Sequence, residues 1–336
     1  MRATTTDLAR AAGCSRTVVS HVLNGRADLP IAAATRERVL QTARTLGYQP
    51  NALARALRSG RTGLLAVWVP DFYPACYARG LQALAAQVRA TPYRLLPGPP
   101  PPWAGGPERN PEEPAWPVDG VLAFQADLRG AWVERVHEQG IPFVGIGSGD
   151  APPTDWVGVD LRAGARAATE HLLRTRRRRI VFLAPTAEPD DPCWRGYEEA
   201  MVAARLEPQR QVLPPRADGG DDAARVYTCL ATWRPDQWPQ AFLCASDACA
   251  LAVLRVLAQR GQRVPDQTAV VGCGGLGPDA PTVPTLTTLA YPFDEVARRA
   301  WQFLEQRLAA PDTPRQHALL ALPLSLGESS EPTRGG

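Results

Sequence analysis

The sequence of 336 residues contains no lysine, because all 37 of its basic residues are arginine. This absence excludes enzymes that depend on a lysine, such as P-loop nucleotide hydrolases and Schiff-base enzymes. It also means that side-chain contacts to phosphate groups through a positive charge fall to arginine or histidine.

Other absences narrow the class of protein further. No run of 18 or more apolar residues is present, so we expect no membrane span. The seven cysteines are an odd number without a C-x-x-C pair, and there are only four histidines. We therefore expect reduced cysteines, no metal and no cofactor. The first residues lack the apolar stretch of a secretory signal, which favours the cytoplasm.

Enzyme motifs are also missing. The sequence has no G-x-S-x-G and no H-E-x-x-H. The glycine-rich run from Gly272 to Gly277 does not fit a dinucleotide fingerprint, because Pro278 follows where a helix should open. We therefore expect that the protein is not an enzyme.

The charge is distributed unevenly along the chain. Residues 1–62 hold ten arginines against three acidic residues, a formal charge of +7 within a total of +3. The remaining residues therefore carry a formal charge of −4. A basic segment on a mildly acidic body indicates that the segment binds a polyanion.

The same basic segment has the pattern of a helix-turn-helix. Residues 6–12 read as a helix, Gly13 permits a tight turn, and Ser15 stands where the N-cap of a second helix belongs. That helix is predicted over residues 16–23, with Val19, Val22 and Leu23 facing inward. A third helix follows over residues 33–46, with core residues that include Val39 and Leu46. In this arrangement the second helix enters the major groove of DNA.

Three motifs in residues 7–51 occur together in a spacing that is typical of one protein family. These motifs are Asp7-Leu8-Ala9, Val19-Ser20-His21-Val22-Leu23-Asn24-Gly25 and Leu46-Gly47-Tyr48-Gln49-Pro50-Asn51. In this register the segment resembles the headpiece of the lactose/galactose repressor (LacI/GalR) family. The resemblance implies a homodimeric transcription regulator, in most members a repressor, whose partners are a double-stranded DNA operator and a small-molecule effector.

The resemblance also implies DNA-binding roles by position. Base edges would be read by Arg16, Thr17 and His21. Phosphates would be bound by Thr5, Ser15, Ser20 and Asn24. A hinge helix in the minor groove would be formed around Ala54, Arg55, Leu57 and Arg58, with Leu57 as the wedge that kinks DNA.

Several of these roles have simpler alternatives. His21 can be a solvated helix residue, and the hydroxyl residues can simply cap helices. Leu57 can pack against the core. Two residues depart from the family pattern: Val18 replaces a common threonine, and Ala32 stands where a serine or threonine usually caps the third helix.

Beyond residue 62, apolar strands alternate with helices, which predicts parallel sheets. The rhythm restarts after Asp160. The fold class is therefore an α/β core of two lobes that resembles periplasmic binding proteins, joined to an all-α headpiece. We expect a headpiece over 1–50, a hinge over 51–62, a core over 63–330 and a polar tail over 331–336. Within the core, lobe 1 would span about 63–160 and 292–325, and lobe 2 about 161–291.

A ligand is expected between the lobes, at the carboxyl ends of the strands. The residues that the resemblance places there are Asp71, Arg195, Asp247 and Cys273. Arg195 can instead form a surface salt bridge, and Asp247 can cap a helix. Cys273-Gly274-Gly275 replaces the aromatic and acidic residues that are usual in the family, which argues against a simple sugar as the effector.

Three further features remain open. The proline-rich segment Pro97–Pro117 reads as an extended linker rather than a helix, and Arg176–Arg179 as a solvated turn rather than a DNA contact. The polar C-terminus lacks the heptads of a coiled coil. Two alternatives to a ligand-responsive repressor are a regulator whose cleft no longer senses a ligand and a solute-binding protein. The headpiece argues against the second.

Overall fold

The computed structural model describes residues 3–23, 30–48, 56, 60–69, 75–99, 117–124, 136, 138–148, 153–215, 222–234, 237–275 and 282–331. The chain divides into two compact units, Met1–Gly63 and Leu64–Gly336. The first unit is the headpiece. The second contains two six-stranded sheets, each the centre of a lobe.

The headpiece is built from three helices, α1 (Thr5–Ala11), α2 (Arg16–Leu23) and α3 (Ala33–Thr45). Their bounds lie within one residue of those that the sequence predicted. Leu8, Val19 and Val39 are fully buried at the centre of a small core. Leu46 was expected in this core and is 40% exposed, so that prediction is wrong. Leu46 lies just beyond the end of α3, as its C-cap.

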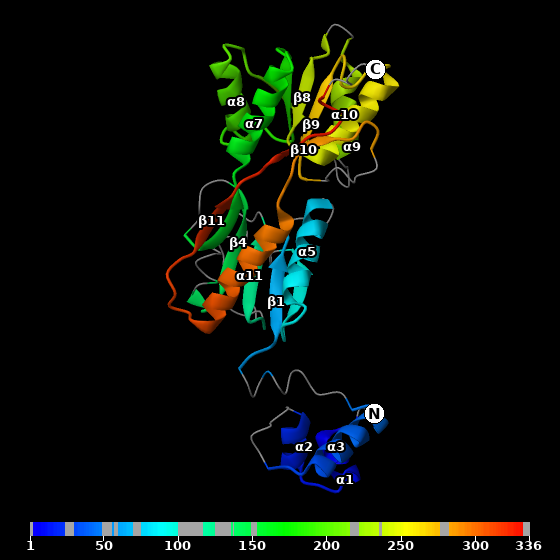
Figure 1. Ribbon diagram of the computed structural model, residues 1–336, viewed down its shortest axis with the longest axis vertical. Coiled ribbons are helices and arrows are strands. Elements are labelled where there is room, and N and C mark those ends of the chain that lie inside the picture. The colour runs from blue at the N-terminus through cyan, green and yellow to red at the C-terminus, as the bar shows by residue number, and fades with distance from the viewer. Residues whose placement is uncertain are drawn as a thin grey trace. The chain divides into compact units, whose positions relative to one another are not determined.

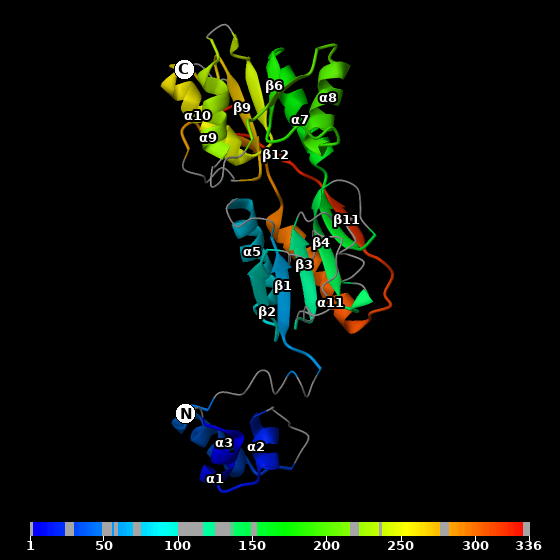
Figure 2. The same cartoon turned by 180° about the vertical axis from the view of Figure 1, so that it is seen from behind.

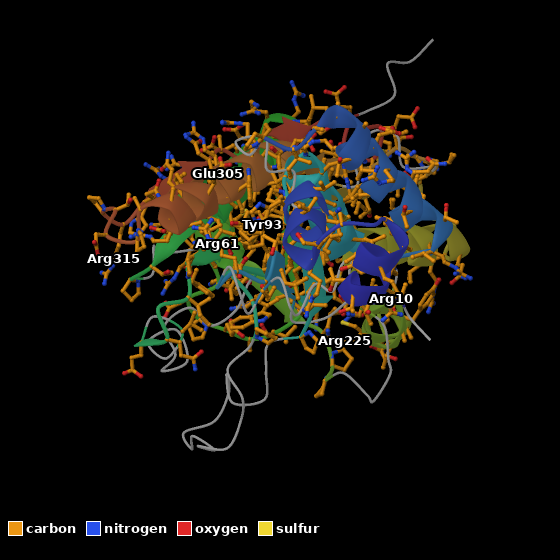
Figure 3. The ribbon with its side chains drawn as sticks, turned by 90° about the horizontal axis from the view of Figure 1, so that it is seen from below. Arg10, Arg61, Tyr93, Arg225, Glu305 and Arg315 are labelled. Atoms are coloured by element: carbon orange, nitrogen blue, oxygen red, sulfur yellow. The ribbon has the colours of Figure 1, made fainter. Side chains whose placement is uncertain are left out.

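Lobe 1 has a parallel sheet in the order β11-β5-β4-β3-β1-β2. Its strands are β1 (Leu64–Trp68), β2 (Arg94–Gly98), β3 (Gly120–Phe124), β4 (Phe143–Ser148), β5 (Asp155–Val159) and β11 (His317–Leu320). Helices α5 (Ala75–Val88) and α11 (Phe293–Ala309) lie side by side on one face (Figures 1 and 2). Tyr93, labelled in Figure 3, meets Trp301 of α11 edge to face, with 5.8 Å between ring centroids.

Successive side chains of a strand point to opposite faces of the sheet, so only alternate residues contact these helices. Leu65 and Val67 of β1 face the cluster that includes α5 and α11, whereas Ala66 and Trp68 face a second cluster around Val136. Both faces of β1, β3 and β4 are apolar, as expected for a covered parallel sheet.

Part of the predicted proline-rich linker is a strand. Pro97 and Gly98 end β2 and stand opposite Val67 and Trp68 of β1. β2 is the edge strand of its sheet, where a proline costs no ladder hydrogen bond on its free side. The linker prediction is therefore wrong for these two residues. Residues 100–116 lie outside the described part of the chain.

Lobe 2 has a sheet in the order β12-β10-β9-β8-β6-β7. Its strands are β6 (Ile180–Ala184), β7 (Gln209–Val212), β8 (Ala241–Cys244), β9 (Ala269–Cys273), β10 (Thr287–Leu289) and β12 (Leu324–Ser325). Only β12 is antiparallel to its neighbour among the described pairs. Helices α7 (Leu161–Arg174) and α8 (Pro192–Ala203) cover one face, and α9 (Asp222–Ala231) and α10 (Asp247–Gln259) cover the other (Figures 1 and 2).

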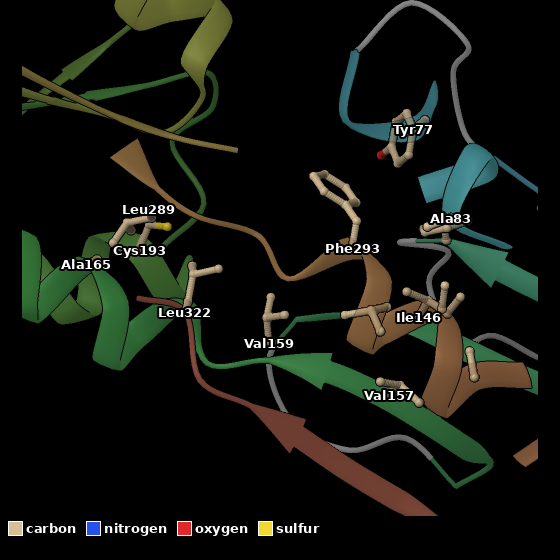
Figure 4. Packing of buried hydrophobic residues seen from close by; sticks show 14 of the residues in the cluster. Tyr77, Ala83, Ile146, Val157, Val159, Ala165, Cys193, Leu289, Phe293 and Leu322 are labelled. Carbon is tan, nitrogen blue, oxygen red and sulfur yellow. The ribbon is translucent and has the colours of Figure 1, made fainter. Parts of the chain in front are cut away.

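The chain passes between the lobes three times. Two passages, after Val159 and after Leu289, lie near the boundaries expected from the sequence. The third follows Leu320, because β12 pairs with β10 of lobe 2 rather than continuing lobe 1. The predicted end of lobe 1 at residue 325 is thus a few residues late. Figure 4 shows Leu322 at this passage, near Cys193 and Ala165 of the same hydrophobic cluster.

The segment after β12 is part of lobe 2. Ser329 and Ser330 are fully buried. The Ser329 hydroxyl donates to the carbonyl of Val270 at 2.6 Å, and the backbone N–H of Val270 donates to the carbonyl of Ser329 at 2.8 Å. Ser330 Oγ lies 2.8 Å from Nε2 of His171, a buried residue of α7. These hydrogen bonds attach the last described residues to β9 and α7 of lobe 2.

This buried histidine predicts a pH dependence of stability. Burial, followed by the charge of Arg174, holds the pKa of His171 below its ordinary value of 6.5, so the folded protein binds a proton there less readily than the unfolded chain. The free energy of unfolding should therefore fall as the pH drops through 6.5 towards the folded-state pKa. Urea titrations of the wild type and His171→Gln at several pH values measure this, and equal pH dependence in both would contradict it.

A close contact between α7 and α8 depends on a glycine. A Cβ atom on Gly196 would overlap the carbonyl oxygen of Arg162 and lie 3.0 Å from the backbone nitrogen of Arg166. Both neighbours are backbone atoms of the facing helix and cannot rotate away. Arg162 also bonds Glu199 of α8, so the two helices are held in this register.

We therefore expect Gly196→Ala to lower the free energy of unfolding by about 1–3 kcal/mol or more, as overpacking does. Gly98→Ala is the matched control, because a Cβ there would meet nothing within 4 Å. Thermal denaturation of both variants compares them. A melting temperature for Gly196→Ala as high as that of Gly98→Ala would show that the helices separate without cost.

The arginine run before β6 is only partly the solvated turn that the sequence predicted. Arg176, Arg178 and Arg179 are exposed, but Arg177 is 7% exposed. Its guanidinium donates to Thr175 Oγ1 at 2.6 Å and to the carbonyl of Pro265 at 2.7 Å. The prediction is wrong for Arg177, which joins the end of α7 to the loop before β9.

Candidate nucleic-acid interface and ligand site

Helix α2 is positioned by its cap and by one apolar face. The N–H of Val18 donates to Ser15 Oγ at 3.2 Å, so Ser15 acts as the predicted N-cap. Gly13, with φ of +61°, makes the turn before it. Val19 and Val22 are buried against α1 and α3, which fixes the rotation of the helix about its axis.

This rotation leaves the predicted base-reading residues on the outer face. Arg16 and Thr17 are exposed, and Ser20 and His21 are half-buried on the same side. No hydrogen bond or ion pair joins the Arg16 guanidinium to another residue of the described chain. The guanidinium is therefore free to form the paired contacts that guanine accepts in the major groove.

Helix α1 begins with a capping box that the sequence reading missed. The N–H of Asp7 donates to Thr4 Oγ1 at 3.3 Å, and the N–H of Thr4 donates to Asp7 Oδ2 at 3.0 Å. The signal was the Thr4-x-x-Asp7 spacing. Thr5, the predicted phosphate ligand, is the first residue inside α1 and is half-buried. Its hydroxyl is not the cap.

A second missed residue braces α3. Arg38 Nε donates to the carbonyl of Ala12 at 2.9 Å, which ties the third helix to the turn before α2. As the sequence suggested, Ala32 gives α3 no side-chain cap. The predicted ligands Asn24, Ala54, Arg55, Leu57, Arg58 and Asp71 lie outside the described residues. Between them, Ala56 is helical and its carbonyl accepts the N–H of Gly60 at 2.8 Å.

In the core, Asp247 follows β8 at the start of α10. Ser246, not Asp247, caps this helix, because its hydroxyl accepts the N–H of Cys249 at 3.1 Å. Asp247 is 4% exposed, and Thr288 donates to its Oδ1 at 2.5 Å. A carboxylate at this position is favoured by the partial positive charge of the helix N-terminus.

Two glycines, Gly272 near the end of β9 and Gly274 just after it, leave room for this carboxylate. A Cβ atom on Gly272 would overlap Asp247 Oδ1, and one on Gly274 would lie 3.3 Å from Oδ2. A side chain at residue 272 would therefore displace Asp247, whereas one at residue 274 would make a tight contact with it. The structure thus brings together Asp247 and Cys273, two of the predicted ligand residues, at the carboxyl end of β9.

Arg195 lies on α8 with its side chain 47% exposed. Its guanidinium donates to Asp190 Oδ1 at 3.0 Å and lies 3.4 Å from Glu198 Oε2. The hydrogen bond to Asp190 and the two nearby carboxylates raise the pKa of Arg195 above its ordinary value. Here Arg195 forms a surface salt bridge. Its role as an effector ligand stays a prediction, because a bound molecule would have to replace these partners.

A cavity of about 580 Å³ lies at the carboxyl ends of β6 and β7. Its described lining is Pro185, Thr186, Val212, Leu213, Pro215, Asp222 and Arg225. Arg225, labelled in Figure 3, lies 3.0 Å from Asp222 and donates to the carbonyls of Pro185 and Pro214. Sequence reasoning missed these residues because it did not predict β7 or α9.

Two other kinds of site are absent from the described residues. No group of three or more His, Cys, Asp or Glu side chains in the described residues is arranged to hold a metal ion. Among the described helices, none is both long and apolar enough to span a bilayer.

Comparison with known proteins gives two family matches. Residues 4–51 match the model of bacterial regulatory proteins of the lacI family, and residues 169–330 match the periplasmic binding protein-like domain. The chain is 30% identical to the HTH-type transcriptional regulator CelR of Thermobifida fusca, over 98% of both chains. It is 31% identical to the HTH-type transcriptional regulator GntR of Pseudomonas aeruginosa, over 92% of this chain and 89% of that one.

Solved structures are similar along the whole length. The lac repressor dimer bound to operator and an anti-inducer has a TM-score of 0.80, with 98% of this chain and 99% of that chain covered. At 20% identity this likeness concerns the fold alone. The CelR–cellobiose complex has a TM-score of 0.64 and 27% identity, over 98% of this chain and all of that one.

Proposed function

Because this chain belongs to the LacI family of bacterial DNA-binding transcription regulators, we propose that it is a repressor controlled by a small molecule. It binds a pseudo-palindromic operator as a homodimer in the cytoplasm, and it catalyses no reaction. The observation that carries this proposal is the Ser15-capped helix α2, which turns Arg16 and Thr17 outward from a fixed core. Family members with this architecture pair two recognition helices across a two-fold axis.

The effector occupies the space at the carboxyl ends of the lobe 2 strands, where Asp247 and Cys273 meet. The carboxylate at this point comes from the start of α10, whereas the family commonly places one after β9. A ligand with hydrogen-bond donors for Asp247 fits this chemistry. The cellobiose named for CelR belongs to that relative. The Cys273-Gly274-Gly275 sequence supports a different effector for this chain.

The test is capture of operator DNA. The purified full-length protein is incubated with sheared DNA from its own genome at moderate salt, and bound fragments are sequenced. Enrichment of a pseudo-palindrome supports the proposal, and the genes beside it suggest candidate effectors. Lack of enrichment, also in the presence of metabolite pools, would count against a working headpiece.

A second candidate function is a regulator that no longer responds to a ligand. The observation in its favour is the engagement of Arg195 by Asp190 and Glu198. Fluorescence anisotropy of the operator complex with added metabolite pools separates the two candidates. A pool that changes operator affinity favours the ligand-responsive regulator. An operator affinity that stays the same with every pool favours the regulator that does not respond to a ligand.

Operator binding should weaken steeply with salt. Each arginine–phosphate contact releases a condensed counterion, so six to ten such contacts lower affinity by about 10³–10⁵ between roughly 50 and 200 mM salt. The headpiece has ten arginines in residues 1–62 with which to form such contacts. Anisotropy titrations across this range give the slope. A flat response would mean that arginine–phosphate contacts do not hold the complex together.

A further inference from the structure

The Arg176–Arg179 run has arginine neighbours that only the folded structure reveals. Strands β6, β7, β8 and β9 are parallel, so the loops that lead into them meet at the end of the sheet where these strands begin. The first residues of β6, β8 and β9 pair in register, Ile180 with Ala241 and Ala241 with Ala269. We call this surface the basic end of lobe 2. It comprises residues 174–179, 204–208, 232–240 and 260–268.

Hydrogen bonds join three of these four loops. The side-chain oxygen of Gln240 accepts the backbone N–H groups of Arg178 at 2.7 Å and of Arg179 at 3.0 Å. The guanidinium of Arg177 donates to the carbonyl of Pro265, in the loop before β9. The arginines of different loops therefore belong to one surface.

The charge of the basic end is opposite to that of the remaining core. Its four loops hold nine arginines against three acidic residues, a formal charge of +6, whereas the other residues beyond 62 together carry −10. Apart from the buried Arg177, every one of these arginines is exposed. The loop into β10 and the segment after β12 add three acidic residues at the same end, which still leaves a charge of +3 there.

The arginines of the first loop lack acidic partners. Within the described residues, no hydrogen bond or ion pair involves the guanidinium groups of Arg174, Arg176, Arg178 and Arg179. Earlier on α7, by contrast, Arg162 donates to Glu199 at 2.7 Å and Arg166 donates to Glu170 at 3.0 Å. The first loop therefore presents four positive charges that the described chain does not pair.

Helix dipoles account for only part of this charge. Helices α7, α8, α9 and α10 each precede one of these four loops, so their C-termini lie at the basic end. A helix C-terminus carries about half an elementary negative charge, which gives about −2 for the four helices. Most of the formal charge of +6 on the four loops is therefore left without a counter-charge from the helices.

The basic end lies apart from the predicted ligand residues. The chain leaves the carboxyl end of β10 for lobe 1, so the strands of lobe 2 begin at the end that is remote from lobe 1 (Figures 1 and 2). Asp247 and Cys273 lie at the opposite, carboxyl ends of β8 and β9. A partner can therefore occupy the basic end without obstructing these two residues.

We propose that the basic end of lobe 2 binds the phosphate backbone of a second segment of double-stranded DNA, separate from the segment that the headpiece reads. Guanidinium groups bind phosphate through paired hydrogen bonds, and such contacts do not depend on base sequence. DNA is favoured over an acidic protein because a DNA-bound headpiece raises the local concentration of duplex around lobe 2. This choice of partner rests on the proposed function.

Capture of a second duplex tests this proposal. Full-length protein is bound at low salt to a random-sequence duplex on beads, and unbound protein is washed away. A fluorescent duplex of another random sequence is then added, and its retention is measured. The basic-end variant is Arg174→Gln/Arg176→Gln/Arg178→Gln/Arg179→Gln. Arg177 stays unchanged because its guanidinium holds Pro265.

The control variant is Arg162→Gln/Arg166→Gln/Arg298→Gln/Arg299→Gln. It removes four arginines that pair with glutamates elsewhere in the core. Both variants lower the formal charge of the chain from +3 to −1, so a difference between them reports on position rather than on total charge. Thermal denaturation checks that both are folded. Arg178→Gln/Arg179→Gln replaces the basic-end variant if that variant does not fold.

We expect the wild type and the control variant to retain the fluorescent duplex, and the basic-end variant to retain at least about tenfold less of it. A rise in salt from roughly 50 to 200 mM should weaken retention by the wild type about 100-fold, as four arginine–phosphate contacts predict. The double variant should lose retention to an intermediate degree, because it keeps two of the four charges.

Four results would overturn the proposal. Equal retention by the wild type and the basic-end variant would mean that the headpieces alone bridge the two duplexes. An equal loss in the control variant would assign the effect to total charge. Retention of labelled polyglutamate, without retention of the second duplex, would identify an acidic protein as the partner. Binding of the first duplex without the second refutes this proposal alone, whereas binding of neither duplex also contradicts the proposed function.

Discussion

Replacing Arg307 by methionine lowers the free energy of unfolding by about 3–5 kcal/mol, the usual cost of removing one partner from a buried ion pair. Arg307, near the end of α11, donates to both carboxylate oxygens of Asp155, at 2.8 and 2.9 Å. The Asp155 side chain is 1% exposed, and that of Arg307 is 16% exposed. Without the guanidinium, a buried carboxylate keeps the N–H of Gln316 as a donor but loses its counter-charge.

The double variant Asp155→Asn/Arg307→Met tests this cause. Because it removes the charge as well as its partner, it should be more stable than Arg307→Met alone. The exposed Arg315, labelled in Figure 3, supplies the control, and Arg315→Met should change stability by less than about 0.5 kcal/mol. Urea denaturation measures all three variants. A double variant no more stable than Arg307→Met would show that lost packing, rather than charge, causes the effect.

Arg16→Ala weakens binding to the captured operator by about 1–3 kcal/mol and relaxes the preference for one base pair, as expected for loss of a bidentate contact to guanine. The prediction follows from the position of Arg16 in the first turn of α2, exposed and on the side opposite Val19 and Val22. Truncation at an exposed position leaves the headpiece core intact, so folding should not change. Titrations against the operator and single-base variants of it give both quantities.

Arg10→Ala is the matched control for this experiment. Arg10, labelled in Figure 3, is also an exposed headpiece arginine. It lies in the last turn of α1 and pairs with Asp7 at 3.9 Å. Its loss should leave the preference between base pairs unchanged, because any phosphate contact of Arg10 is the same for every sequence. If Arg16→Ala and Arg10→Ala had the same preference among the operator variants, this would contradict a base contact by Arg16.

The headpiece could be predicted from sequence because its signals are local. A glycine turn, a capping serine and apolar residues at helical spacing specify α2 within a short stretch. The same logic failed for Leu46, since periodicity does not tell whether a residue at a helix end still lies over the core. It also failed for Thr4, whose capping role depended on noticing Asp7 three residues later.

In the core, the long apolar strands β1 and β6 were predictable, whereas weak or interrupted elements were missed. β5 contains an ionic residue and a glycine, and its burial depends on Arg307 far along the chain. The amphipathic α11 was missed although Val296, Ala300 and Leu304 follow helical spacing. The burial of Arg177 depends on its hydrogen bond to Pro265, and the position of Asp247 depends on the space beside Gly272 and Gly274. Both are contacts between distant segments, which a single sequence does not show.

The return of the chain to lobe 2 after β11 has a consequence for its synthesis. β12 supplies the sixth strand of the second sheet, and Ser329 and Ser330 fill positions against β9 and β10. During translation, β6 to β10 are therefore synthesised before β12, the strand that completes their sheet. Domains fold as units once their chain is available. A premature stop codon just before β12 would leave β10 as an exposed sheet edge, which favours aggregation.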